Sequence, residues 1–197
     1  MQFSCLTVYL FDNKLEFTNI VKNTLNTSSI PLWINGICIK NKSFVMINGK
    51  NNLGISEADY KRIIHELIHQ NLFIMYCKDN VLPLWLNEGI ALFFANQFSD
   101  KEKVKISKHL KHSSLPDFNS LNKNFVNLGG YHLAPSIIEF IITKYNIDML
   151  YELCGIFSQK EYFEVGKLFD EWHQYLRETY FNFTPSVKYR ERTVETI

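Results

Sequence analysis

The sequence predicts an α+β fold in which a small N-terminal β-sheet and one long helix precede a mainly α-helical lobe. Two observations support this order. Apolar residues alternate with polar ones, or form short β-rich runs, within the first 47 residues, whereas from residue 56 onward they recur at helical spacing. Strands that come before helices, instead of alternating with them, are typical of α+β folds.

The N-terminal sheet is predicted from three runs. Residues 3–11 alternate polar and apolar side chains, as a half-buried strand does. Asp12 then caps a short helix with apolar positions up to Leu25. Residues 33–39 and 43–47 are rich in β-branched and apolar residues, so both are predicted strands. Turn signals lie between and after them, at residues 40–42 and at Asn48-Gly49.

Two helices follow the sheet. Ser56 and Asp59 form a variant of the capping box, and apolar positions at helical spacing continue from there to about Tyr76. Polar residues at 78–80 break the pattern. Pro83 suits the first turn of a second helix that runs to about Phe98.

The C-terminal half is predicted to be mainly helical. A polar, Lys-rich connection comes first, at 101–128, with a short helix near 103–111. Gly129-Gly130 opens a third helix, followed by two more; these helices lie at about 132–145, 147–154 and 160–181. The predicted organisation is a single domain over 1–182, with an upper lobe at about 1–78, a lower lobe at about 79–182 and a polar tail at 183–197.

Composition restricts the partners of this chain. Its 197 residues are 46% hydrophobic and 15% aromatic, enough for a sizeable core. The formal net charge is +1 without a long basic run, so neither a nucleic acid nor a membrane surface is expected as a partner. The four cysteines form no CxxC pair, which disfavours a thiolate metal site.

The expected location is the cytoplasm. The first residues lack the cationic segment and the apolar run of a signal peptide, although secretion after removal of a precursor segment stays open. No transmembrane segment is predicted, because no stretch approaches the roughly 20 apolar residues that span a bilayer.

Residues 65–69 read HELIH, an HExxH pattern inside the long predicted helix. Residues four apart lie on one face of an α-helix, so His65 and His69 can reach one metal ion. Glu66 lies about 100° further round, where its carboxylate can take a proton from a water molecule at the ion. The alternative interpretation is a surface helix with solvated side chains, since this short pattern also occurs by chance.

Glu88 is the candidate third ligand, because a catalytic zinc site takes three protein ligands and keeps one position open. It lies in the run WLNEGIALFF, at 85–94, and residues 70–87 allow the first helix to end and a second to return. The apolar neighbours would bury Glu88. An isolated buried carboxylate is costly, so a bound cation is a simpler explanation than a solvent-facing helix residue.

HELIH followed at this spacing by WLNEGIALFF resembles the gluzincin zinc metallopeptidases, the thermolysin and aminopeptidase-N group, and in particular its short members. The resemblance is strong at residues 62–94 and diffuse over residues 5–180, where Trp33 with Gly36 and the run EWHQYL at 171–176 also match.

This resemblance implies a thermolysin-like zincin catalytic domain that hydrolyses peptide or protein substrates. One Zn²⁺ would be held by the two histidines and the glutamate, with Glu66 as general base. It also implies Tyr131, just before the third helix, as the residue that stabilises the oxyanion. The alternatives are a half-buried structural tyrosine at this position and His132 as the donor.

Two departures from the family are visible. The Gly-x-Met-Glu-Asn strand, by which aminopeptidase-N-like members hold a free amino terminus, has no counterpart; the nearest region, 41–49, lacks the glutamate. Cleavage inside a chain and cleavage from an end therefore both stay open. The aspartate that thermolysin places one turn after its glutamate ligand falls on Leu92, so another group must orient that histidine.

Further expectations concern the groove and the remaining rings. The strand at 43–47 is predicted to be the sheet edge above the metal, where an extended peptide can pair with it. Surface positions are expected for His109, His112 and His173, and core positions for Trp33, Trp85 and Trp172.

A catalytically silent or latent gluzincin-fold module, acting in regulation or protein binding, is the alternative function. The intact Glu66 argues against a silent site, since a structural zinc needs no base. Latency would place the tail at 186–197, with Glu191 or Glu195, in the groove.

Overall fold

The computed structural model describes residues 6–39, 42–47, 54–76, 82–159 and 165–185. Within these ranges the protein is mixed α+β, with a three-stranded sheet first and eight helices around and after it, which confirms the predicted class. The elements are β1 Thr7–Phe11, α1 Lys14–Leu25, β2 Gly36–Ile39, β3 Lys42–Met46, α2 Glu57–Tyr76, α3 Leu84–Phe94, α4 Asp100–His112, α5 Phe118–Lys123, α6 Gly130–Lys144, α7 Ile147–Ser158 and α8 Val165–Tyr180. Of the turn predicted at 40–42, Lys42 belongs to β3 and residues 40–41 lie outside the described residues. The turn predicted at 48–49, the break at 78–80 and residues 186–197 of the predicted tail also lie outside them.

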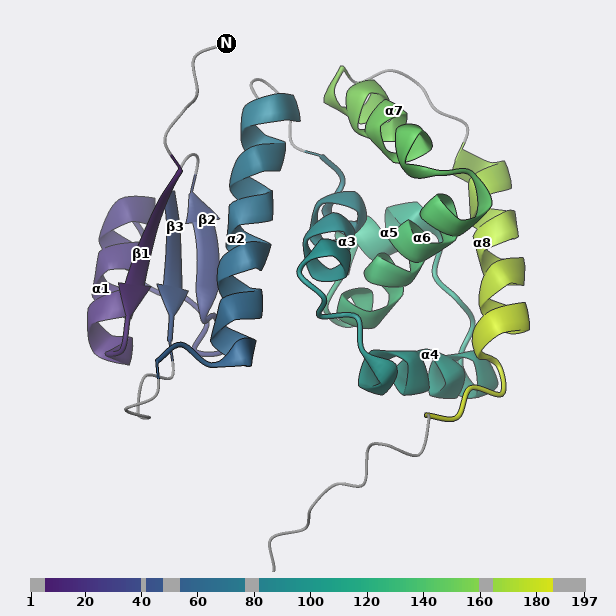
Figure 1. The fold of residues 1–197 in the computed structure, drawn as a ribbon, viewed down its shortest axis with the longest axis horizontal. Coiled ribbons are helices and arrows are strands. Elements are labelled where there is room, and N and C mark those ends of the chain that lie inside the picture. The colour runs from purple at the N-terminus through teal and green to yellow at the C-terminus, as the bar shows by residue number, and fades with distance from the viewer. Residues whose placement is uncertain (1–5, 40–41, 48–53, 77–81, 160–164, 186–197) are drawn as a thin grey trace, which may run out of the picture.

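The sheet has the strand order β1-β3-β2 and lies between α1 and α2 (Figure 1). β3 pairs in parallel with β1 and antiparallel with β2. The prediction that residues 43–47 form the sheet edge was therefore wrong: β3 is the central strand, and β2 is the edge strand beside α2. The reason is topological. β2 occupies one side of β3, and β1, which is connected to β2 through α1, pairs with the opposite side of β3.

α1 covers one face of this sheet. Phe17 and Val21 are fully buried and pack with Phe11 and Phe44. Its N-cap is Asn13 and not the predicted Asp12. The Asn13 side chain accepts hydrogen bonds from the second and third backbone N–H groups of the helix, which is the contact that defines an N-cap.

α2 covers the opposite face of the sheet, and buried polar groups form hydrogen bonds between the two. At its start, the Ser56 hydroxyl accepts from the Asp59 N–H at 3.1 Å, which confirms the predicted cap. Further along, the Gln70 amide donates to the Thr7 carbonyl and to the Ser43 hydroxyl, which in turn donates to the Glu66 carbonyl oxygen. These contacts fix the rotation of α2 about its axis.

The helices α3 to α8 lie together on the far side of α2 from the sheet (Figure 1). Their buried apolar side chains form a second hydrophobic cluster. α3 packs closely against α6, and Gly89 permits this approach, since a Cβ there would lie 2.8 Å from the Ala134 carbonyl oxygen. Trp85 and Trp172 are buried in this cluster, as predicted. Among the described residues, no helix has both the length and the apolarity that crossing a bilayer requires.

Several helix boundaries differ from the prediction; α6, for example, begins at Gly130, and α7 extends to Ser158. α3 ends at Phe94 instead of Phe98, because Asn96 adopts a left-handed conformation with φ 55°. The connection at 101–128 is largely helical, with a longer α4 than predicted and the additional α5. α4 begins earlier because Ser99 and Glu102 form a complete capping box.

Candidate metal centre

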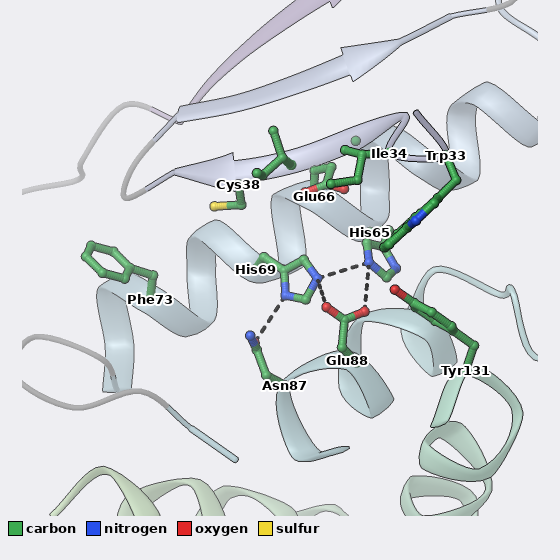
Figure 2. Close-up of a pocket in the computed structure, with 12 residues that line it drawn as sticks. Trp33, Ile34, Cys38, His65, Glu66, His69, Phe73, Asn87, Glu88 and Tyr131 are labelled. Carbon is green, nitrogen blue, oxygen red and sulfur yellow. Dashed lines mark hydrogen bonds and ion pairs between the residues drawn. The ribbon is translucent and has the colours of Figure 1, made fainter. Parts of the chain in front are cut away.

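A cavity of about 370 Å³ lies between the edge strand β2 and the helices α2 and α3 (Figure 2). Its wall includes the three predicted ligands, the predicted base and the predicted oxyanion donor. The lining residues are Trp33, Ile34, Gly36, Ile37, Cys38, His65, Glu66, His69, Phe73, Asn87, Glu88 and Tyr131. The cavity therefore brings together residues from separate parts of the sequence around one point.

Three side chains converge in this cavity. The Nε2 atoms of His65 and His69 lie 3.0 Å apart, and the Glu88 carboxylate oxygens lie 3.6 and 3.5 Å from them (Figure 2). In a tetrahedral site with bonds of about 2.1 Å, neighbouring ligand atoms lie about 3.4 Å apart. The three observed separations are close to that value, so the donor set fits a single divalent ion.

Helix geometry explains this convergence. His65 and His69 are four residues apart on α2, on the face turned toward α3. Glu88 lies on α3 and reaches them from the opposite side of the cavity. Burial raises the pKa of Glu88, while the charge of His69 acts against this shift. A bound cation would favour the ionised carboxylate.

Both histidines are suited to bind a metal through Nε2. Burial, followed by the charge of His69, lowers the pKa of His65 to about 3, so its imidazole is neutral at physiological pH. The other histidine is oriented by Asn87, whose Oδ1 lies 3.1 Å from Nδ1 of His69. An amide oxygen accepts, so this contact places the proton on Nδ1 and leaves the Nε2 lone pair directed into the cavity.

Asn87 is a site residue that the sequence analysis missed. The signal was a polar residue directly before Glu88 in an otherwise apolar helix. Trp33 was also misplaced: it is 61% exposed and lines the cavity instead of the core. It precedes β2 in a segment that runs over the surface, where its ring has no covering layer.

Glu66 lies beside the three ligands and points toward β2 (Figure 2). It is only 5% exposed and sits under Gly36, where a Cβ atom would lie 2.3 Å from its Oε1. Burial, then the charge of Glu88, raises the pKa of Glu66 to about 8, and Arg62 partly opposes the shift. Such a carboxylate can exchange a proton near neutral pH.

The side chains of Tyr131 and His132 point in different directions. The Tyr131 ring packs edge-on against Phe125, and its hydroxyl points toward His65 and Glu88 (Figure 2). Burial, followed by the charges of Glu88 and Glu66, raises the pKa of Tyr131, so the hydroxyl keeps its proton. His132 does not line the cavity; its ring lies against His109, with ring centres 5.9 Å apart. Of the two candidates, only Tyr131 faces the ligands.

Neither the models of known protein families nor the curated proteins that were compared with this chain give a match.

Proposed function

We propose that this chain is a zinc-dependent peptidase of the gluzincin type, with a thermolysin-like catalytic domain. One observation carries the proposal: the nitrogens of His65 and His69 and the carboxylate of Glu88 converge at ligand spacing, with Glu66 buried beside them. Two imidazoles and one carboxylate, with room for a further ligand, are the donor set of a catalytic zinc site. A structural zinc site is normally closed by a fourth protein ligand.

In the proposed reaction, Glu66 and Tyr131 have separate roles beside the metal ion. When bound, the zinc ion supplies Lewis-acid polarisation of the scissile carbonyl and lowers the pKa of water. Glu66 takes the proton of the attacking water and later delivers it to the leaving amine. Tyr131 donates its hydroxyl hydrogen to the oxygen on which negative charge develops. Glu66, Tyr131 and the three proposed ligands all line the same cavity.

The edge strand β2 is proposed to bind the substrate backbone. Met46 N–H donates to the Asn35 carbonyl at 2.8 Å, so these two residues form a hydrogen-bonded pair. Such pairs alternate in an antiparallel ladder, so the N–H and C=O of Gly36, opposite Val45, point away from β3. Because Gly36 lines the cavity, an extended peptide can pair with it there.

Digestion of a peptide library by the zinc-loaded protein tests the proposed function. Cleavage should stop when a chelator removes the metal and return when zinc is added back. Peptides with free and with blocked amino termini, compared by mass spectrometry, would assign cleavage inside the chain or from its end. No cleavage of any peptide by protein that holds one zinc per chain would contradict the proposal.

A Gly36→Ala variant should lose activity while keeping its metal. The new methyl group would displace the Glu66 carboxylate, which has little room because it is buried. We expect kcat to fall about a hundredfold, the typical cost of misplacing a reacting group by about 1 Å. Steady-state kinetics and zinc content measure both effects. Gly155→Ala is the control, since a Cβ there meets nothing within 4 Å; equal kcat values for the two variants would refute the close-approach argument.

Tyr131→Phe should lower kcat about a hundredfold and change KM little, because loss of one oxyanion donor costs roughly 10²–10³ in rate. The aromatic packing on Phe125 is retained in this variant. Tyr151→Phe, at a position 54% exposed on α7, removes a hydroxyl away from the cavity and serves as the control. An unchanged kcat in Tyr131→Phe would assign the tyrosine a structural role.

A further inference from the structure

Two large rings in the cavity wall belong neither to the proposed metal site nor to a hydrophobic cluster. Trp33 is 61% exposed and Phe73 is 36% exposed, although both line the cavity. Neither ring is a member of the two clusters that hold the fold together. A ligand that covers exposed aromatic surface gains free energy in proportion to the area removed from water. In a cleft, such rings are typical of a wall that contacts a ligand.

The two rings lie on opposite sides of the proposed metal ligands. β2 and α2 run side by side in the same direction (Figure 1). Trp33 comes shortly before β2 and lies beside His65, whereas Phe73 lies one helical turn beyond His69 on α2 (Figure 2). Four residues along a helix correspond to about 6 Å along its axis. The ligands therefore lie between the two rings, along the direction in which β2 would align a substrate.

Trp33 shares its end of the cavity with a second ring. Tyr131 reaches the His65 side from α6, on the wall opposite the segment that carries Trp33 (Figure 2). Its ring packs edge-on against Phe125, which holds it in place. A substrate side chain that enters this end of the cavity lies between two aromatic rings. This setting favours an aromatic or large apolar side chain.

Phe73 shares the other end of the cavity with Cys38 (Figure 2). Gly36 and Cys38 are two residues apart on β2, so both side-chain positions face α2. Burial, followed by the charge of Glu66, raises the pKa of the Cys38 thiol to about 11, so the thiol stays uncharged near neutral pH. A neutral thiol packs as a small apolar group. This end is therefore apolar as well.

The charges of the cavity wall also favour uncharged substrate side chains. Among the described residues that line the cavity, none is a lysine or an arginine, and the carboxylates are those of Glu66 and Glu88. An acidic substrate side chain would meet these carboxylates without a cationic side chain to pair with. A basic side chain would compete for groups that the metal and the reaction require. In both cases a charge would lose hydration without compensation.

We infer that Trp33 and Phe73 determine substrate specificity: Trp33, opposite Tyr131, receives a large apolar side chain on one side of the scissile bond, and Phe73 receives one on the other side. The inference rests on the proposed peptidase function and names its substrate class. The substrates are extended polypeptide segments with apolar or aromatic side chains on both sides of the cleaved bond. Folded proteins bury such segments, so unfolded chains are the substrates that present them.

Digestion of a random peptide library with blocked ends by the zinc-loaded protein measures the preference at each position around the cleaved bond. The wild type should prefer large apolar residues to alanine on both sides by about tenfold or more in kcat/KM, the discrimination typical of a hydrophobic pocket. Trp33→Ala should lower this ratio about tenfold on one side, and Phe73→Ala should lower it on the other. Trp33→Phe keeps a ring and should retain most of the preference.

Leu32→Ala is the matched control, because Leu32 is 85% exposed beside Trp33 and does not line the cavity. Its preferences should equal those of the wild type. If Trp33→Ala does not fold, Trp33→Gln makes the same test with a longer, polar side chain.

Three results would overturn the inference: no apolar preference in the wild type, an unchanged preference in the Trp33 and Phe73 variants, or a change on the same side of the cleaved bond in both. A preference that falls equally in Leu32→Ala would also overturn it, since the effect would then not come from the cavity. No cleavage of any peptide by wild-type protein that holds one zinc per chain would instead refute the proposed function. The two failures are therefore distinguishable.

Discussion

Glu66→Gln is expected to retain one zinc per chain and to lose nearly all peptide hydrolysis. The amide has the shape of the carboxylate but cannot take a proton from water, and a positioned acid–base group contributes roughly 10²–10⁴ in rate. Because Glu66 lies beside the three ligands and not among them, the metal should remain. Initial rates on a cleaved library peptide, with metal content by elemental analysis, measure the two quantities on one sample.

The control for this variant is Glu152→Gln, at an exposed position on α7. It makes the same chemical change outside the cavity and should keep full activity. Turnover by Glu66→Gln at the wild-type rate would end the proposed mechanism. Loss of the metal along with activity would instead show that Glu66 is needed for metal binding, contrary to its position in the cavity.

His69→Ala should abolish stoichiometric zinc binding and, with it, all metal-dependent activity. The change removes one of three convergent ligands, so the loss of affinity should exceed the roughly 10–100-fold that follows loss of a supporting group. A ligand that binds only the folded state stabilises it by about 2.7 kcal/mol at 100 times its Kd. Zinc should therefore raise the melting temperature of the wild type and leave that of His69→Ala unchanged.

His112→Ala is the matched control, because His112 is exposed on α4 outside the cavity. Its zinc content and thermal shift should equal those of the wild type. Unfolding of both variants without zinc separates a loss of affinity from a loss of fold. One zinc per chain in His69→Ala, at wild-type affinity, would mean that the three side chains do not form the metal site.

The elements that the sequence predicted well are those whose signal is local. The helical period and the cap at Ser56 define the start of α2 without reference to the rest of the chain. The end of α3 and the start of α4 were predicted less accurately, since a left-handed Asn96 decides the first and the Ser99–Glu102 capping box decides the second. Such boundaries depend on one or two contacts that hydrophobic periodicity does not record.

The order of the strands in the sheet could not be predicted from local sequence patterns. β2 and β3 were both recognised as strands, but which of them is central depends on where β1 pairs. That choice is made by the α1 crossover, through contacts between residues far apart in the sequence. As a result, the strand beside the cavity is the one containing Gly36, and not the predicted strand at 43–47.

The amino-acid sequence by itself determined the order of strands and helices. It also identified His65, His69, Glu88 and Glu66 as candidates, because spacing on a helix and the cost of burying a lone carboxylate are local properties. Only the tertiary structure decided that these side chains meet at ligand distance and that the Asn87 amide faces the His69 imidazole. It also turned Tyr131, and not its neighbour His132, toward them. The physical reason is that ring orientation and hydrogen-bond partners are set by the packing of α2, α3 and β2 around one cavity, which no segment specifies alone.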